Sequence, residues 1–250
     1  MNNEASIVKK ISILAMTFSI IALLTTISHA IQSLYNSYAA DECIYDTWRW
    51  TTMYFTELME SNQSLNKFAI GLDSLMIDIL GIYFLYLYIV KGTIALVYTI
   101  ILFFIFRFLS LGFAGKWPKP IPYLFINPGV PSLFIPYDAT NDYYFSGHVG
   151  QTVIICITSY YMRRKKLTII ALLVFVYTIF ILLVVGGHYF NDLLIGLVVA
   201  TVSSWIVIQY VFELNLYVLN AGCTSYSYIG DKIYKKGETT NKMDINDTLC

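Results

Sequence analysis

The chain has 250 residues, of which 57% are hydrophobic and 13% are charged, and its formal net charge at pH 7 is zero. Soluble domains carry about 25% charged residues, so this composition excludes an ordinary soluble protein and indicates an integral membrane protein. The few basic residues are clustered, and we predict no nucleic-acid partner.

Six apolar runs are each long enough to cross about 30 Å of hydrocarbon. They predict an all-α fold, a polytopic membrane protein built as a six-transmembrane-helix bundle. The predicted spans are Ile11–Ile27, Phe68–Val90, Thr93–Leu111, Tyr143–Met162, Leu167–Val185 and Leu193–Phe212.

The first of these runs has two interpretations. Lys9 and Lys10 precede it and Ser28-His29-Ala30 follows it, as in a secretory signal with a small-residue cleavage site. We favour a retained helix, because its apolar core of about seventeen residues exceeds the roughly 7–15 residues of such signals. The predicted organisation is a first transmembrane helix or signal segment (1–30), a lumenal loop (31–67), a catalytic core (68–212) and a cytosolic tail (213–250).

Basic residues set the predicted orientation. Lys9-Lys10, Lys91 and the run 163–166 fall on one side of the alternating spans, and the positive-inside rule makes that side cytosolic. The loops 28–67 and 112–142 then face the lumen or the exterior, where Asn62 lies in a glycosylation sequon. We predict a multi-pass protein of the Golgi, the endoplasmic reticulum or the plasma membrane, and the sequence does not choose among these.

Two histidine motifs, "DYYFSGHVGQT" and "GGHYFND", carry the chemistry of the chain. His148 opens the fourth predicted span and His188 closes the fifth, and the short basic turn between these spans makes them antiparallel. Both histidines are therefore predicted at one membrane level. Asp192 lies four residues after His188, on the same helix face, where its carboxylate can orient the imidazole.

These groups suit phosphoryl transfer through a covalent intermediate. His188, oriented by Asp192, attacks the phosphorus of a phosphodiester, and His148 serves as the general acid and base. Gly147 allows a ligand to approach the backbone, and Ser146 either caps the helix or binds a phosphate oxygen beside the helix N-terminus. We predict no metal and no cofactor. The alternative is that both histidines are interface residues directed toward lipid head groups.

The two motifs resemble those of the sphingomyelin synthase family, a branch of the type 2 phosphatidic acid phosphatase superfamily. Ser-Gly-His-Val, Met-Arg-Arg after the fourth span and Gly-His-Tyr are also similar to the plant phosphatidylcholine:diacylglycerol cholinephosphotransferases. The resemblance covers about residues 68 to 212. It implies a six-helix fold and a catalytic triad of His148, His188 and Asp192, with Arg107 similar to an arginine of the family.

The resemblance also implies the reaction, which is transfer of phosphocholine or phosphoethanolamine from a glycerophospholipid to ceramide or diacylglycerol. Lipid phosphatases of the superfamily carry Lys-x6-Arg-Pro and an arginine six residues before the second histidine. The chain lacks the first motif and has Leu182 at the second position. Since these cations hold a phosphate monoester, their absence argues against phosphatase action.

Weaker candidates surround these motifs. Asp73 and Asp78 are intramembrane carboxylates, and Asp73 is predicted either to meet the choline or ethanolamine cation or to pair with Arg107. Asp142 either anchors its loop, which we favour, or faces the substrate's ammonium. Three tryptophans can stack on choline, although a place in the interfacial aromatic belt is favoured; they are Trp48, Trp50 and Trp117.

The sequence leaves three functions open. A head-group transferase acting on phosphatidylcholine or phosphatidylethanolamine, ceramide and diacylglycerol is favoured. A phospholipase C-like hydrolase or a phosphatase would use the same histidines with water as acceptor, and a non-enzymatic lipid-binding protein would carry a relict site. Head group, acceptor, the formation of a homo-oligomer and glycosylation of Asn62 are not determined by the sequence.

Overall fold

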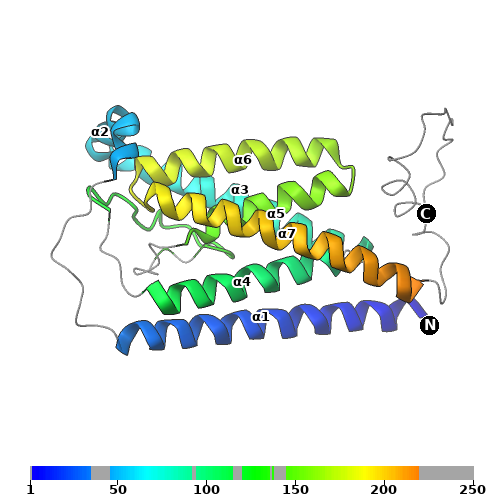
Figure 1. The fold of residues 1–250 in the computed structure, drawn as a ribbon. Coiled ribbons are helices and arrows are strands. Elements are labelled where there is room, and N and C mark those ends of the chain that lie inside the picture. Colours follow the sequence, from blue (N-terminus) through cyan, green and yellow to red (C-terminus); the bar gives the residue numbers. More distant parts are fainter. Residues whose placement is uncertain are drawn as a thin grey trace, which may run out of the picture. The chain divides into compact units, whose positions relative to one another are not determined.

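The computed structural model describes residues 2–34, 46–91, 94–114, 120–135, 137 and 145–219. The described residues form seven α-helices, one short 3-10 helix and no strand, which confirms the all-α prediction (Figure 1). In chain order the elements are α1 (Asn2–Leu34), η2 (Thr47–Thr52), α2 (Met53–Ser61), α3 (Gln63–Lys91), α4 (Ile94–Ala114), α5 (Gly147–Tyr161), α6 (Lys165–Val184) and α7 (Phe190–Leu219).

The chain forms two compact units, residues 1–205 and residues 206–250. In the second unit the described residues are 206–219, the end of α7. All packing, cavities and site residues discussed below belong to the first unit.

Four of the described helices are long and apolar enough to cross a membrane, so the protein is a membrane protein. They contain the stretches Lys10–Ile27, Gln63–Val90, Lys165–Val184 and Phe190–Tyr210. The predicted count of six spans is not confirmed. The apolar part of α4, Ala95–Ser110, is shorter, and α5 has 15 residues rather than the predicted twenty because its N-cap is Ser146.

The first unit packs around α5 and α6, which contact each other through most of their length and are joined by a short turn. Helix α3 packs on both, and α4 packs on α5 (Figure 1). Helix α1 packs on α4 and α3, while η2 and α2 lie against α6. The buried centre is apolar and aromatic, and it includes Phe103, Phe145, Val149, Ile154, Leu182 and Leu193.

Two glycines allow the chain to turn into α7 and α7 to approach α5. Gly186 has a φ of +63°, in the left-handed region that favours glycine. A Cβ at Gly196 would lie 2.6 Å from the carbonyl oxygen of Ser146, so only glycine allows α7 to approach the start of α5 this closely. The backbone N–H of Ser146 also donates to the carbonyl of Asp192, over 3.2 Å. The two histidine motifs are therefore joined directly through the backbone.

Candidate active site

The structure brings His148 and His188 together. His148 lies in the first turn of α5, and His188 lies in the turn between α6 and α7. Their ring centroids are 5.8 Å apart with an angle of 69° between the ring planes. The two residues are forty positions apart in the chain, and their proximity is what the antiparallel arrangement of their helices predicts.

Asp192 lies beside His188, in the first turn of α7. The Nδ1 atom of His188 and the Oδ2 atom of Asp192 are 3.5 Å apart, and both side chains are buried. The same Oδ2 accepts a hydrogen bond of 2.9 Å from the backbone N–H of Tyr189. A carboxylate at a helix N-terminus is favoured by the helix dipole, so Asp192 is held where it can fix the orientation of the His188 ring.

The surroundings of His188 keep its ring neutral. Burial first, and then the positive charge of Arg107, lower the pKa of His188 to about 3. His188 is therefore unprotonated at neutral pH. Nδ1 is the ring nitrogen directed toward Asp192, and a neutral imidazole carries one basic nitrogen.

His148 presents a buried ring nitrogen without a partner. Its Nε2 atom has no hydrogen-bond partner among the described residues, and its ring packs against the ring of Phe125 at 6.2 Å. A buried polar atom without a partner costs free energy unless a ligand or water satisfies it. This atom therefore marks a place where a substrate group can bind.

The start of α5 combines a helix N-terminus with an arginine. Ser146 is its N-cap, and the Oγ atom of Ser146 accepts from the N–H of Val149 over 3.4 Å, so the structure gives Ser146 the capping role of its two predicted roles. The guanidinium of Arg107 lies against Gly147, where a Cβ would be 3.5 Å from Cζ and from Nε. Helix dipole and guanidinium together favour an anion here.

The weaker carboxylate candidates, Asp73 and Asp78, do not lie at this site. Asp73 accepts a hydrogen bond of 2.6 Å from the hydroxyl of Thr178, which joins α3 to α6. Asp78 accepts from the hydroxyl of Ser132 and from two backbone N–H groups, and so holds the loop 132–134. Neither residue lines the cavity that contains the histidines, and Asp142 lies outside the described residues.

Both histidines line a cavity of about 320 Å³ that is mostly apolar. Polar side chains occur near the histidine end, where Arg107 and Gln151 join the two rings. Gln151 was missed by the sequence reasoning, although its spacing of three from His148 places both on one face of a helix. Helix α1 also contributes residues to the lining of this cavity, which the sequence analysis did not predict. Among the described residues no group of three or more His, Cys, Asp or Glu side chains is placed to hold a metal ion.

The segment from Asp46 to Thr56 borders the site. From the sequence, only its tryptophans Trp48 and Trp50 are candidates for a role there. Four of its contacts reach the residues on either side of His188, and we call this segment the clasp. Asp46 accepts a 2.7 Å hydrogen bond from the N–H of Phe190, and Trp48 stacks on the ring of Phe190 at 4.5 Å. Thr56 donates to the carbonyl of Val184 over 3.0 Å.

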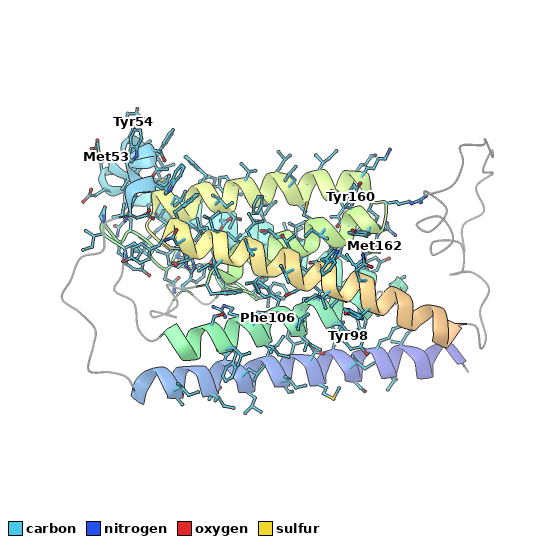
Figure 2. All side chains as sticks on the ribbon, in the orientation of Figure 1. Met53, Tyr54, Tyr98, Phe106, Tyr160 and Met162 are labelled. Carbon is cyan, nitrogen blue, oxygen red and sulfur yellow. The ribbon has the colours of Figure 1, made fainter. Side chains whose placement is uncertain are left out.

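Arg49 makes the fourth contact of the clasp. Its guanidinium donates to the carbonyl of Pro122 and lies so close to Gly186 that a Cβ there would overlap it. Arg49 is 8% exposed; burial lowers its pKa, and the nearby Asp46 carboxylate opposes that shift. The turn that carries His188 is therefore enclosed by a second segment of the chain. The other tryptophan of this segment, Trp50, is exposed, and Met53 and Tyr54 point away from the helices (Figure 2).

These features define a class of protein: an all-helical membrane protein with a buried histidine pair at one end of an apolar cavity. A comparison with protein families identifies the family. A family model described as AtPDCT1/2, the plant phosphatidylcholine:diacylglycerol cholinephosphotransferase family, matches residues 45–208. This is well over half of the chain, and the chain belongs to this family.

The match confirms the predicted similarity to the plant cholinephosphotransferases, whereas membership of the sphingomyelin synthase family stays a prediction. No curated protein and no solved structure matches the chain. The matched region begins at residue 45 and so includes the clasp, which the predicted core of residues 68–212 left out.

Proposed function

We propose that this protein is a membrane-bound transferase that moves phosphocholine from a glycerophospholipid to diacylglycerol through a phospho-histidine on His188. The observation that carries the proposal is the pair of histidines at the end of an apolar cavity, 5.8 Å apart and with Asp192 behind one of them. Membership of the AtPDCT1/2 family supports phosphocholine as the group transferred and diacylglycerol as the acceptor.

In the first half of the proposed reaction, the Nε2 atom of His188 attacks the phosphorus of phosphatidylcholine. The bond between phosphorus and the glycerol oxygen breaks, and His148 gives a proton to the departing oxygen. Burial, and then His188 and Arg107, lower the pKa of His148 to about 3; the negative charge of a bound phosphodiester opposes this shift, so His148 takes up that proton when the substrate binds. This releases diacylglycerol and leaves phosphocholine on His188. Arg107 and the N–H groups at the start of α5 face the phosphate oxygens, where they offset its negative charge.

In the second half, His148 takes the proton from the hydroxyl of a second diacylglycerol. The oxygen attacks phosphorus, the bond between phosphorus and His188 breaks, and a new phosphatidylcholine leaves. The same residue must act as acid in one half and as base in the other, which is a requirement of a symmetric exchange. Asp192 keeps its hydrogen bond from the N–H of Tyr189 and its place beside Nδ1 of His188, so that it holds His188 in one orientation throughout.

A phosphodiester carries one negative charge, and the site suits that charge. Leu182 occupies the position where lipid phosphatases of the superfamily are expected to carry an arginine, and it lines the cavity with its apolar side chain. Among the described residues that line the cavity, Arg107 is the one arginine or lysine, and the helix N-terminus adds positive potential beside it. This arrangement favours a diester substrate over a monoester.

The test uses purified protein in detergent, with a donor phosphatidylcholine and an acceptor diacylglycerol that carry different acyl chains. Transfer produces a phosphatidylcholine with the acceptor's chains, recognised by its mass, and we expect this product with the wild type and none with His188→Ala. Asn191→Ala, an exposed neighbour in the first turn of α7, is the control that should keep full activity. Free phosphocholine without a new lipid would instead assign a hydrolase, and modification of added ceramide alone would assign a sphingomyelin synthase.

A further inference from the structure

The cavity extends from the histidines deep into the helices. On α4 its lining residues run from Arg107 to Leu96, which is eleven positions or about 16 Å at 1.5 Å per residue. On α5 they run from Gly147 to Ile155, or about 12 Å. The polar end holds the proposed chemistry, and the remaining length is mostly apolar and has no use in that chemistry.

Helix α1 forms one wall of this apolar part. Its lining residues follow a spacing of three and four, the pattern of a single helix face; they are Leu14, Thr17, Phe18, Ile21 and Thr25. The family match begins at residue 45, so this wall lies outside the region that the family model matches. If residues 1–30 were instead a cleaved secretory signal, this side of the cavity would be open.

Tyr88 lies at the end of the cavity that is far from the histidines. It is 1% exposed, and its hydroxyl has no hydrogen-bond partner among the described residues. Next to it, the Nζ atom of Lys10 donates to the carbonyl of Ile89 over 2.9 Å and ties α1 to α3. The far end of the cavity is thus fixed by a large side chain and by a contact between the two helices.

We propose that α1 and Tyr88 complete a chamber for one acyl chain of the lipid substrate, and that Tyr88 sets the longest chain that fits. The identity of this ligand rests on the proposed function, which places a lipid head group between the histidines. A volume of about 320 Å³ is at the small end of ligand cavities, which suits one chain and leaves the second chain of a diacyl lipid outside.

Selectivity in this chamber is steric. An acyl chain that enters from a bilayer leaves surroundings as apolar as the chamber, so the hydrophobic effect does not favour its entry. Chain length is then discriminated by whether the last carbons meet Tyr88 or find room. Enlarging the far end should admit longer chains, and filling the middle should exclude long chains while short ones still bind.

Thr17 and Thr26 offer a matched pair for the test. Both are on α1, and both hydroxyls donate to the carbonyl four residues earlier, over 2.8 Å and 2.9 Å. Thr17 is 4% exposed and lines the cavity, whereas Thr26 is exposed and is not among its lining residues. Thr17→Phe is expected to slow transfer of long-chain lipids at least tenfold more than that of short-chain lipids, and Thr26→Phe should match the wild type. Tyr88→Ala is expected to shift the preferred chain toward longer lipids.

A second measurement needs no turnover. A phosphatidylcholine with a photoreactive diazirine at the end of one acyl chain is incorporated with the wild-type protein and irradiated, and the labelled residues are found by mass spectrometry. Label on Tyr88, Leu96 or Thr17 supports the chamber even if no transfer is detected, in which case the proposed function alone fails. Label confined to outward-facing positions such as Ile20 and Leu23 would overturn the chamber, as would equal chain-length profiles for Thr17→Phe and Thr26→Phe.

Discussion

Asp192 shows how one residue links the fold to the proposed chemistry. Its Oδ2 atom is near Nδ1 of His188 and also accepts from the N–H of Tyr189. Asp192→Asn keeps an oxygen acceptor for that N–H but removes the carboxyl group that faces Nδ1 and favours one ring tautomer. We expect kcat to fall about 100-fold with KM little changed, because the effect is on the chemical step. Steady-state transfer kinetics check this, with Asn191→Ala as control; an unchanged kcat would remove Asp192 from the proposed mechanism.

The neutral His188 makes stability depend on pH. Its pKa is lowered in the folded protein and returns to about 6.5 in the unfolded chain. Between these values the unfolded state binds more protons, so this contribution to stability is fully present above about pH 6.5 and is lost as the pH falls. The loss is at most about 1.4 kcal/mol per pH unit for one group.

Unfolding temperatures of the protein in detergent, measured from about pH 7.5 down to about pH 5, should therefore decrease. His188→Gln, which cannot be protonated, should decrease less over the same range. Parallel curves for the two proteins would show that His188 is not a buried neutral group.

At the scale of single residues, the sequence correctly predicted that His148 and His188 lie close together, because two helices joined by a short turn bring their ends to one level. It did not predict the place of Asp73. The partner of Asp73 is Thr178, which is 105 positions away, and no local pattern indicates which buried polar groups will meet. The same reason explains why Gln151 was overlooked: its significance comes from the cavity that other helices enclose.

At the scale of elements, the clasp is the least predictable part of the site. Its helices η2 and α2 have 6 and 9 residues, far fewer than the roughly 20 apolar residues of a membrane span, and the sequence predicts a loop over residues 31–67. Its function comes from long-range contacts such as the one between Asp46 and Phe190. The long helices were predicted because their apolar runs are unambiguous, although α3 begins at Gln63 and not at Phe68.

The clasp gives a prediction at this scale. Asp46→Ala removes the acceptor for the N–H of Phe190, two residues after His188, and a hydrogen bond to a charged group contributes about 1.5–3 kcal/mol. We expect a roughly tenfold lower kcat with an unchanged KM, since the turn is displaced while the cavity is kept. Asp46→Asn retains an oxygen and should recover most of the rate.

Equal rates for Asp46→Ala and the wild type, in protein with the same unfolding temperature, would contradict the positioning role of the clasp. Glu60→Ala serves as the control for removal of a carboxylate from this part of the chain, because Glu60 is exposed on α2. A loss of rate in both variants would point to a general effect on the segment.

On the scale of the whole molecule, the structure fixes which groups share an end of the helices. The clasp lies against the end of α6 through Thr56 and Val184, and α2 leads directly to Asn62, so Asn62 and the histidines are at the same end. The basic turn at residues 163–166 is at the other end of α5 and α6. Composition alone gave the membrane class, whereas this arrangement needed the packing of distant segments.

The positive-inside rule then predicts that the site faces the lumen or the exterior. Single cysteines at Ser61 and at Lys166, both exposed, report the two ends when sealed microsomes are treated with a maleimide that does not cross membranes. We expect Lys166→Cys to react at once and Ser61→Cys to react only after detergent opens the vesicles, with the wild type giving the background from its own cysteines. The reverse pattern would place the histidines in the cytosol, and the lipids exchanged would then be those of the cytosolic leaflet.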